Sequence, residues 1–562
     1  MRGIPKIFAV TILLLVAAIV FSPLAVALCG TSLQMLGLAE AFRGTAGAYA
    51  ASAASALVSA IVSLVIGVPF ALLVERSRPK FKRIFWALGL LALMVPPYIA
   101  AEGWIVLLGP AGKISKPLAI LLGFGPRSPD ALALSRFLVP GFGYSWPAVG
   151  VIMGGCLFPI VALAIASTLR RTDHRIFESA RIAQGSAGVR RIAAHILVPP
   201  ALGAALLVFA VTLTEFAVPQ LLRVRTIGEA VYEWIQEGDL ASAAMLSLPL
   251  LPLVVSAGAL GAFMLMRARV ASLAGLEGEV PKFTGRETGS AGDLCAGAAT
   301  FFALIPALLL PAASLIWLAV TAKHAPVAGT GTHRLLRASG FLNSLSGAWD
   351  LAHDDAVRTV WLAALAAAIA LALAMLLVRC TLRFGWSSLL GGLGAGLAVP
   401  APLVGLGLIC LWDHDWSVWI YQGPAVIVLA WFARFLPLTI FLAHGALARV
   451  PHELESAAAL AGRGSWERFF AVVIPNALPG LVAAWLATYV LSATEFSATV
   501  LIAPAGAPLL APSVINLMRR GQDPEIAACQ FLLLAVIALP LVFIAGGAGL
   551  RAWLWGGGKK SL

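Results

Sequence analysis

Two short stretches, one in each half of the chain, decide the fold: residues 177–185, FESARIAQG, and residues 454–462, LESAAALAG. Glu455 stands 277 positions after Glu178, and both stretches end in a glycine, Gly185 or Gly462. Small residues before the glycine predict a short helix that another surface can approach closely. The glycine itself permits a turn that other residues resist. Each copy therefore predicts a bend at the end of a short helix.

An amphipathic helix is predicted after each glycine, because apolar residues recur there at positions i, i+3, i+4 and i+7. They are Val189, Ile192, Ala193 and Ile196 in the first copy and Trp466, Phe469, Phe470 and Val473 in the second. Proline then opens the next apolar run, at Pro199 or Pro475, a position where its missing N–H costs little. We call residues 177–199 the first elbow and residues 454–475 the second elbow. One such segment would be an ordinary interfacial helix, whereas two at matching places favour a docking surface met by a two-fold partner.

The composition excludes an ordinary water-soluble enzyme. Of the 562 residues 60% are hydrophobic and only 12% charged, against roughly 25% charged in a soluble domain. The net charge of +13 comes from basic residues in short segments between apolar runs, which indicates cytoplasmic loops rather than nucleic-acid binding. The six cysteines are scattered without a C-x-x-C or Cys/His cluster. No disulfide framework, metal site or bound cofactor is expected.

Apolar runs of about 20 residues are long enough to cross a bilayer as helices. The chain has about twelve, six in each half, near residues 8–30, 52–74, 84–108, 146–168, 199–222, 242–266, 296–320, 357–378, 388–411, 425–445, 476–501 and 526–550. Loops rich in Arg and Lys place both termini in the cytoplasm. Prolines interrupt several spans, among them Pro96, Pro159 and Pro437, and can act as hinges or as static bends.

The duplication divides the chain into a first half at 1–275, a cytoplasmic linker at 276–292 and a second half at 293–562. Each half holds an even number of spans, so both insert with the same orientation. We therefore predict an all-α integral membrane protein of two parallel six-helix repeats, with a pathway between them. A duplicated scaffold without a pathway is the alternative that duplication alone leaves open.

Two acidic residues, Glu215 and Glu495, fall at equivalent places inside the fifth and eleventh predicted spans. A charge at a helix centre costs roughly 2.5–3.5 kcal/mol, so each should face protein or water. They either line the pathway, which their symmetry favours, or are structural groups hydrogen-bonded to Thr214, Thr494 or a neighbouring helix. Arg434 in the tenth span has no counterpart in the first half. A pair with a carboxylate is its expected role, beside the pathway.

The two elbows resemble the EAA loops of permease subunits in ATP-binding cassette (ABC) importers of the type I arrangement. The family pattern is Glu-Ala-Ala, three residues and Gly, then Ile-x-Leu-Pro. Here each glutamate lies one residue earlier, and a serine occupies its usual position. The resemblance implies the type I importer membrane fold and assigns ATPase coupling to Glu178, Ser179, Ala180, Gly185, Pro199, Glu455, Ser456, Ala457, Ala458, Gly462 and Pro475.

The resemblance also implies partners: two copies of an ABC ATPase subunit at the cytoplasmic face, a periplasmic solute-binding protein, and the lipid of a bacterial inner membrane. The chain has no G-x-x-x-x-G-K-[ST] loop, so ATP belongs to the partner and no catalytic residue is expected here. The stretch 95–100, VPPYIA, is most similar to ferric-iron permeases. Relatives that carry 2-aminoethylphosphonate, thiamine, sulfate or polyamines share much of the pattern. A secondary transporter with twelve spans is the alternative from another class.

Overall fold

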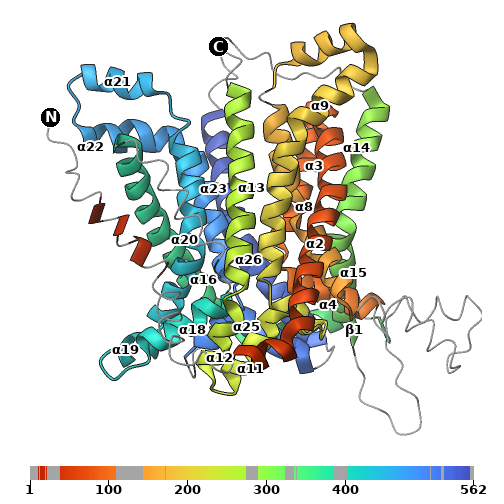
Figure 1. The fold of residues 1–562 in the computed structure, drawn as a ribbon, viewed down its shortest axis with the longest axis vertical. Coiled ribbons are helices and arrows are strands. Elements are labelled where there is room, and N and C mark those ends of the chain that lie inside the picture. The colour runs from red at the N-terminus through yellow and green to blue at the C-terminus, as the bar shows by residue number, and fades with distance from the viewer. Residues whose placement is uncertain are drawn as a thin grey trace, which may run out of the picture. The chain divides into compact units, whose positions relative to one another are not determined.

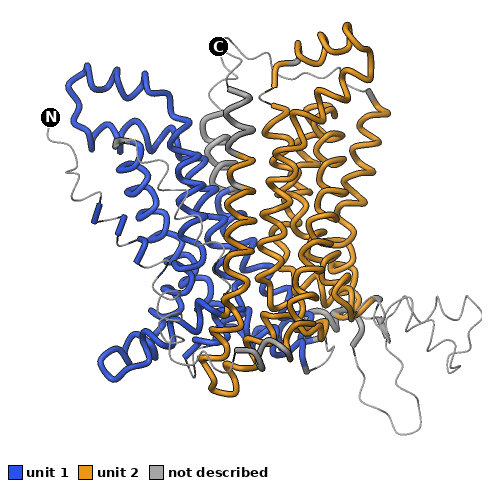
Figure 2. The backbone as a smooth tube through the Cα atoms, viewed as in Figure 1, with its two compact units in different colours: residues 1–27, 319–397, 403–562 blue, residues 28–318, 398–402 orange. Residues whose placement is uncertain are grey.

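The structure is a computed structural model. It describes residues 38–108, 144–170, 172–273, 289–322, 335–336, 338–384, 399, 401–504, 506, 508–520 and 524–556, with a few positions between 10 and 21. The predicted linker lies mostly outside the described residues. The chain forms two compact units, coloured separately in Figure 2. Unit 1 comprises Met1–Ala27, Ala319–Leu397 and Leu403–Leu562, and unit 2 comprises Leu28–Leu318 and Ala398–Pro402.

Unit 2 is built from helices, most of them long and apolar (Figure 1). Its described elements are α2 (Leu38–Arg76), α3 (Pro79–Leu91), the 3-10 turn η2 (Ala92–Met94), α4 (Pro97–Leu108), α8 (Trp146–Leu169), α9 (His174–Leu213), α10 (Ala217–Leu221), α11 (Ile227–Gln236), α12 (Leu240–Ser247), α13 (Leu250–Leu273), α14 (Gly289–Leu304), the π-helix η3 (Ile305–Leu309) and α15 (Leu310–Val320). The longest of them run beside one another, and α10 to α12 are short helices at one end.

Unit 1 has the same kind of architecture. Its described helices are α16 (Ala338–Phe384), α18 (Ala401–Trp412), whose first two residues cluster with unit 2, α19 (Val418–Tyr421), α20 (Ala425–Leu447), α21 (His452–Leu460), α22 (Ser465–Arg468), the π-helix η5 (Phe469–Val473), α23 (Ile474–Ala493), α24 (Thr499–Ile502), α25 (Leu510–Arg520) and α26 (Pro524–Gly556). Two antiparallel strands of two residues each, β1 (Thr321–Ala322) and β2 (Leu335–Leu336), are the described exception to the helical fold.

The predicted spans are largely confirmed. Within the described residues, nine helices are long and apolar enough to cross a membrane, or ten when the bent pair Pro79–Met94 and Pro97–Leu107 is taken as one span. These ten coincide with ten of the twelve predicted spans. Of the other two, 8–30 lies mostly outside the described residues, and 388–411 is described mainly by the short apolar helix Ala401–Trp412. The described part of the chain therefore has the long apolar helices of a multi-pass membrane protein.

Three spans differ in shape from the prediction. The span 84–108 bends by 90° at the break before Pro97, because two successive prolines there remove backbone donors from the helix. The span 199–222 stops at Leu213, and the span 476–501 stops at Ala493. By contrast, Pro159 and Pro437 lie inside the unbroken helices α8 and α20. Proline alone therefore does not decide where these helices break.

Close backbone packing holds α2 against α8 in unit 2. A Cβ added at Gly150 or Gly154 would lie within 2.8 Å of backbone or side-chain atoms of α2, and one at Gly67 would lie 2.7 Å from the carbonyl oxygen of Phe158. Small residues of this kind let membrane helices approach closely. The hydroxyl of Thr212 on α9 donates to that of Ser59 on α2 at 2.9 Å. Small side chains and a buried hydroxyl pair therefore define the centre of this unit.

The helices α14 and α15 pack in unit 2, although they follow the predicted linker in the chain. Gly103 of α4 lies so close to Pro311 that an added Cβ would stand 2.5 Å from its Cα. The indole N–H of Trp104 donates to the carbonyl oxygen of Pro306 at 3.1 Å. The packing units therefore do not follow the repeat boundaries, and the division into sequence halves stays a prediction about duplication.

Candidate coupling elbows and intramembrane carboxylates

The first elbow is a sharp kink inside α9. Asp173 caps the start of α9 by accepting a hydrogen bond from the backbone N–H of Arg175 at 2.9 Å. The helix then breaks at Gln184 (φ −138°, ψ 16°) and Gly185 (φ +60°, ψ −146°) and resumes. An added Cβ at Gly185 would meet nothing within 4 Å. Glycine is needed here for its backbone angles, since space is available.

The second elbow turns at the predicted glycine too. Gly462 has φ +82°, and its backbone N–H donates to the carbonyl oxygen of Ala459 at 3.0 Å, while that of Arg463 donates to Ala458 at 3.1 Å. This pair of bonds is a Schellman motif, in which a left-handed glycine ends a helix. The glycine turn predicted at both places is confirmed.

The prolines after the two turns occupy different positions from each other. Pro475 lies in the first turn of α23, where the sequence predicts it. Pro199 lies inside α9, well past the kink, so the prediction that it opens a new helix is wrong. We call the helical segments before and after each turn glycine the first and second legs of the elbow. The second leg of the first elbow and the following span form one continuous helix, and Pro199 lies inside it. In the second elbow, the π-helix η5 separates α22 from α23.

The apolar stripes of the elbows are only partly buried. In the second elbow Phe469 and Val473 are buried, whereas Trp466 is exposed and Phe470 is 61% exposed. Just before the turns, Ile182 is 88% exposed and Leu460 is 92% exposed. These two side chains are the most exposed of the large hydrophobic residues in the described part of the chain. The two turns therefore each present an apolar residue for contact outside the described chain.

A groove lies along the first elbow. It has a volume of about 670 Å³ and is lined by Ile176, Arg191, Ile192, His195 and Ile196. Two of these residues, Ile192 and Ile196, belong to the predicted apolar stripe of the second leg. The lining combines three isoleucines with Arg191 and His195, and the groove is open to the surface. Such a surface suits an apolar partner that also carries acidic groups.

Most of the candidate coupling residues lie on α9 in the first elbow and on α21 in the second. Ala180 is buried, and Glu178 and Ser179 are exposed on α9. The hydroxyl of Ser179 donates to the carbonyl oxygen of Arg175 at 2.6 Å. On α21, Ser456 Oγ lies 3.0 Å from His452 Nδ1. Ala457 is exposed and Ala458 half-buried. Glu455 is bound by Arg379 of α16, with guanidinium-to-carboxylate distances of 2.5 and 3.1 Å.

The two acidic residues of the membrane region lie at helix breaks, so their expected place inside continuous spans is wrong. α9 ends before Thr214 (φ −97°, ψ 1°), and α23 ends before Thr494 (φ −100°, ψ −3°). Glu215 then accepts a hydrogen bond from the backbone N–H of Ala217 at 3.0 Å. At each break the carboxylate accepts backbone N–H bonds at the start of the next short helix, α10 or α24.

Glu495 is held by several groups. Its carboxylate accepts bonds from the backbone N–H groups of Ala498 and Thr499 at 2.9 Å, and from the Thr499 hydroxyl. Arg434 of α20 adds an ion pair at 3.2 Å, as its expected role as a carboxylate partner requires. Glu495 is buried and Glu215 half-buried. In the first half, the buried Cys156 stands near the place of Arg434.

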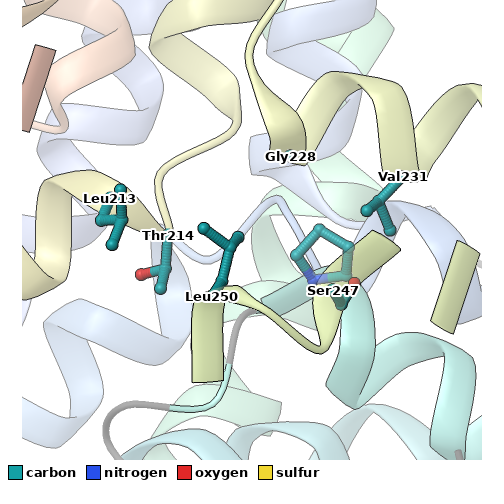
Figure 3. Close-up of a pocket in the computed structure, with 7 residues that line it drawn as sticks. Leu213, Thr214, Gly228, Val231, Ser247 and Leu250 are labelled. Carbon is teal, nitrogen blue, oxygen red and sulfur yellow. The ribbon is translucent and has the colours of Figure 1, made fainter. Parts of the chain in front are cut away.

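A small cavity of about 10 Å³ lies beside the first of these breaks (Figure 3). It is lined by Leu213, Thr214, Gly228, Val231, Ser247, Leu250 and Pro402. Its volume is near that needed for one water molecule. Among the described residues, no group of three or more His, Cys, Asp or Glu side chains could hold a metal ion.

Sequence reasoning missed a charged cluster at the end of α2. Glu75, which is buried, is paired with Lys82 at 2.5 Å and with Arg170 at 2.6 Å, and it accepts the indole N–H of Trp86 at 2.9 Å. The Arg170 guanidinium also lies 5.5 Å from the centre of the Trp86 ring. A lone acid at the end of an apolar run, followed by several basic residues, was the signal available in the sequence.

The comparisons with known proteins agree with this architecture. Residues 370–550 match the family model of the binding-protein-dependent transport system inner membrane component. The chain is similar to the Fe(3+)-transport system permease protein FbpB 2 of Haemophilus influenzae, with 25% identity over 79% of this chain and 78% of that protein. It is 26% identical to the putrescine transport system permease protein PotI of Escherichia coli over 34% of this chain and 72% of the relative.

A third relative is the putative 2-aminoethylphosphonate transport system permease protein PhnV of Salmonella paratyphi A. The identity is 29% over 25% of this chain. The match to this relative covers 53% of its length, so the chain spans about half of it. The names of these relatives differ in the solute and agree in describing permease proteins.

Proposed function

We propose that this chain, which is similar to permease proteins of binding-protein-dependent transport systems, forms the membrane pathway of an ATP-driven ABC importer. A periplasmic solute-binding protein delivers the solute outside, and the solute passes between the two repeats to the cytoplasm. Two copies of an ABC ATPase subunit dock on the two elbows. The chain lies in a bacterial inner membrane with both termini in the cytoplasm.

The observation that carries this proposal is the pair of elbows. Each has a glycine of positive φ at its turn, and each exposes a large apolar residue next to it, Ile182 or Leu460. Coverage of these side chains by a partner removes apolar surface from water, at about 25 cal/mol per Å². A duplicated docking surface on one chain fits two copies of the same partner.

For the solute we propose ferric iron, because the relative that covers most of this chain has an Fe(3+)-transport name. 2-Aminoethylphosphonate, thiamine, sulfate or a polyamine remains the alternative cargo. Glu215, which is half-buried at its helix break, is proposed to line the pathway. The carboxylate of Glu495 is already bound by four donors, one of them on Arg434. We therefore propose that Glu495 and Arg434 form the wall of the pathway on the side of the second repeat.

Reconstitution tests the proposal directly. The chain is purified with the ATPase subunit encoded beside it and placed in liposomes, with the neighbouring solute-binding protein and ferric ion outside and ATP inside. We expect uptake that requires ATP hydrolysis and all three components. Uptake driven by an ion gradient without the ATPase would overturn the proposal and favour a secondary transporter. Replacing ferric ion by each alternative solute in the same liposomes identifies the cargo.

A further inference from the structure

One position of the repeat carries opposite charges in the two halves. Residues 72–76 read LLVER and residues 376–380 read LLVRC, so Glu75 of α2 corresponds to Arg379 of α16. The hydroxyl of Ser77 donates to the carbonyl oxygen of Val74 at 2.8 Å, and that of Thr381 donates to Val378 at 3.0 Å. The two positions therefore share a hydroxyl-to-backbone bond two residues on, although α2 ends at Arg76 and α16 continues to Phe384.

The first half neutralises its acid internally. Glu75 is bound by Lys82 and by Arg170, the residue that caps the end of α8. In the second half the equivalent cap of α20 is Ala448, which has no charge to offer. Both members of the Glu75–Arg170 pair are thus replaced in the second half. Arg379 stands in place of the acid Glu75, and Ala448 stands in place of the base Arg170. The charge at this position must find a different partner.

Arg379 finds that partner in the second elbow, and it contacts both legs. Its guanidinium binds the carboxylate of Glu455 on α21 through two hydrogen bonds. It also lies 5.2 Å from the centre of the Phe469 ring on η5. A planar guanidinium suits both contacts, because it pairs bidentately with carboxylates and stacks on aromatic rings. One side chain therefore bridges the two legs across the turn at Gly462.

The first elbow brings its legs together in another way. An added Cβ at Gly188 would lie 2.6 Å from the carbonyl oxygen of Ala180 and 2.8 Å from Cβ of Gln184. The two legs thus approach by direct packing of small residues. In the second elbow a serine, Ser465, follows at the place equivalent to Gly188. In that elbow the described link between the legs is the charged bridge of Arg379.

We propose that Arg379 is a positioning residue that fixes the angle of the second elbow for its partner, so that the two docking surfaces are not equivalent. The identity of the partner as an ATPase subunit rests on the proposed function above. The bridge itself is a property of this chain. Loss of the bridge therefore loosens the second elbow alone and weakens docking there, whereas the first elbow keeps its geometry.

Hydrogen exchange on the full chain in lipid nanodiscs tests the bridge without any partner. In Arg379→Gln we expect backbone exchange over residues 452–468 to rise about tenfold, as loss of charge-assisted hydrogen bonds predicts. Exchange over residues 174–190 stays unchanged. The matched control is Arg463→Gln, which removes an exposed arginine of the same elbow that pairs with Glu467 at 3.7 Å. The control leaves exchange in both regions unchanged.

A charge-swapped variant separates positioning from folding. Arg379→Glu with Glu455→Arg keeps an ion pair but loses the contact with the Phe469 ring, so it restores part of the protection over residues 452–468 that each single change removes. Unchanged exchange in Arg379→Gln, an equal rise in both elbows, or failure of the swap to restore protection would overturn the proposal. If Arg379→Gln or either single swap change does not fold, Glu455→Gln is measured instead and gives the same rise.

The second readout is capture of the ATPase subunit co-expressed with the chain. We expect Arg379→Gln to retain less ATPase than wild type, and the charge-swapped variant to regain it. If the bridge behaves as described but wild type captures no ATPase, the proposed function fails and the bridge stands. If wild type captures ATPase while Arg379→Gln neither loosens the elbow nor loses ATPase, the bridge fails and the proposed function stands.

Discussion

Replacing the turn glycines by alanine is expected to weaken ATPase docking while insertion into the membrane is preserved. At Gly185 and Gly462 an added Cβ meets nothing within 4 Å, so the cost comes from the backbone alone. A non-glycine residue held in such a conformation costs about 1–3 kcal/mol. If the elbow instead relaxes to ordinary angles, the docking-competent fraction falls by about 5- to 150-fold, and the apparent affinity falls with it.

The two glycines should differ in size of effect. Gly185, with φ +60° and ψ −146°, lies near a region that glycine alone commonly occupies. Gly462 ends a Schellman motif with φ +82°, where alanine costs roughly 1–2 kcal/mol. We therefore expect Gly185→Ala to lose more affinity than Gly462→Ala, and the double variant to lose most.

The assay is titration of the purified ATPase subunit against the chain in nanodiscs, with membrane insertion checked by fractionation. Gly445→Ala is the matched control, because Gly445 lies within α20 and its added Cβ also meets nothing within 4 Å. Alanine in a helix interior is favoured over glycine by about 0.5–1 kcal/mol, so this control keeps full affinity. Equal affinity of the two turn variants and the control would refute the reasoning.

Three further outcomes are expected. Arg434→Met leaves Glu495 buried without its cation and lowers stability by about 3 kcal/mol, whereas Arg434→Met with Glu495→Gln recovers part of the loss; a thermal melt in detergent that fails to separate the two would contradict this. Gly154→Leu destabilises by about 1–3 kcal/mol or more, since even a Cβ there lies 2.6 Å from the carbonyl oxygen of Ser59; an unchanged melting temperature would count against the described packing of α2 and α8. The Arg379 guanidinium holds the pKa of Glu455 below its usual value, with smaller contributions from Arg468 and His452. The ion pair therefore stabilises the elbow fully above the ordinary glutamate pKa of about 4.3, and this stabilisation is lost as pH falls through the lowered pKa of Glu455. Hydrogen-exchange protection of residues 452–468 that declines already between pH 8 and pH 6 would disprove this prediction.

The positions of the spans and of the turns could be predicted, because both depend on local sequence. Hydropathy over about 20 residues marks a helix that can cross a bilayer. The turn glycines were found because the motif occurs twice. Glycine has no side chain and can therefore adopt the positive φ that each turn has, and a glycine is visible in the sequence itself.

The breaks at Glu215 and Glu495 could not be predicted from hydropathy, since the apolar runs continue on both sides of each acid. At each break the carboxylate bonds the backbone of a new short helix, a contact of a few residues that an average over about 20 residues does not reveal. The bridge between Arg379 and Glu455 joins residues 76 positions apart. Periodicity and composition carry no information about such a pairing. Only comparison of the two repeats, charge by charge, points to it.

The place of α14 and α15 in unit 2 has a consequence for how the chain is made. These helices contact α2, α3, α4 and α8, which leave the ribosome long before residue 318 is synthesised. Until then, the faces that α14 and α15 will cover, at Gly103 and Trp104 for example, remain open to lipid. At a synthesis rate of about 5–20 residues per second, that interval lasts roughly ten seconds or more. A fragment ending before Gly289 would leave those faces permanently uncovered, and we expect membrane quality-control proteases to degrade it.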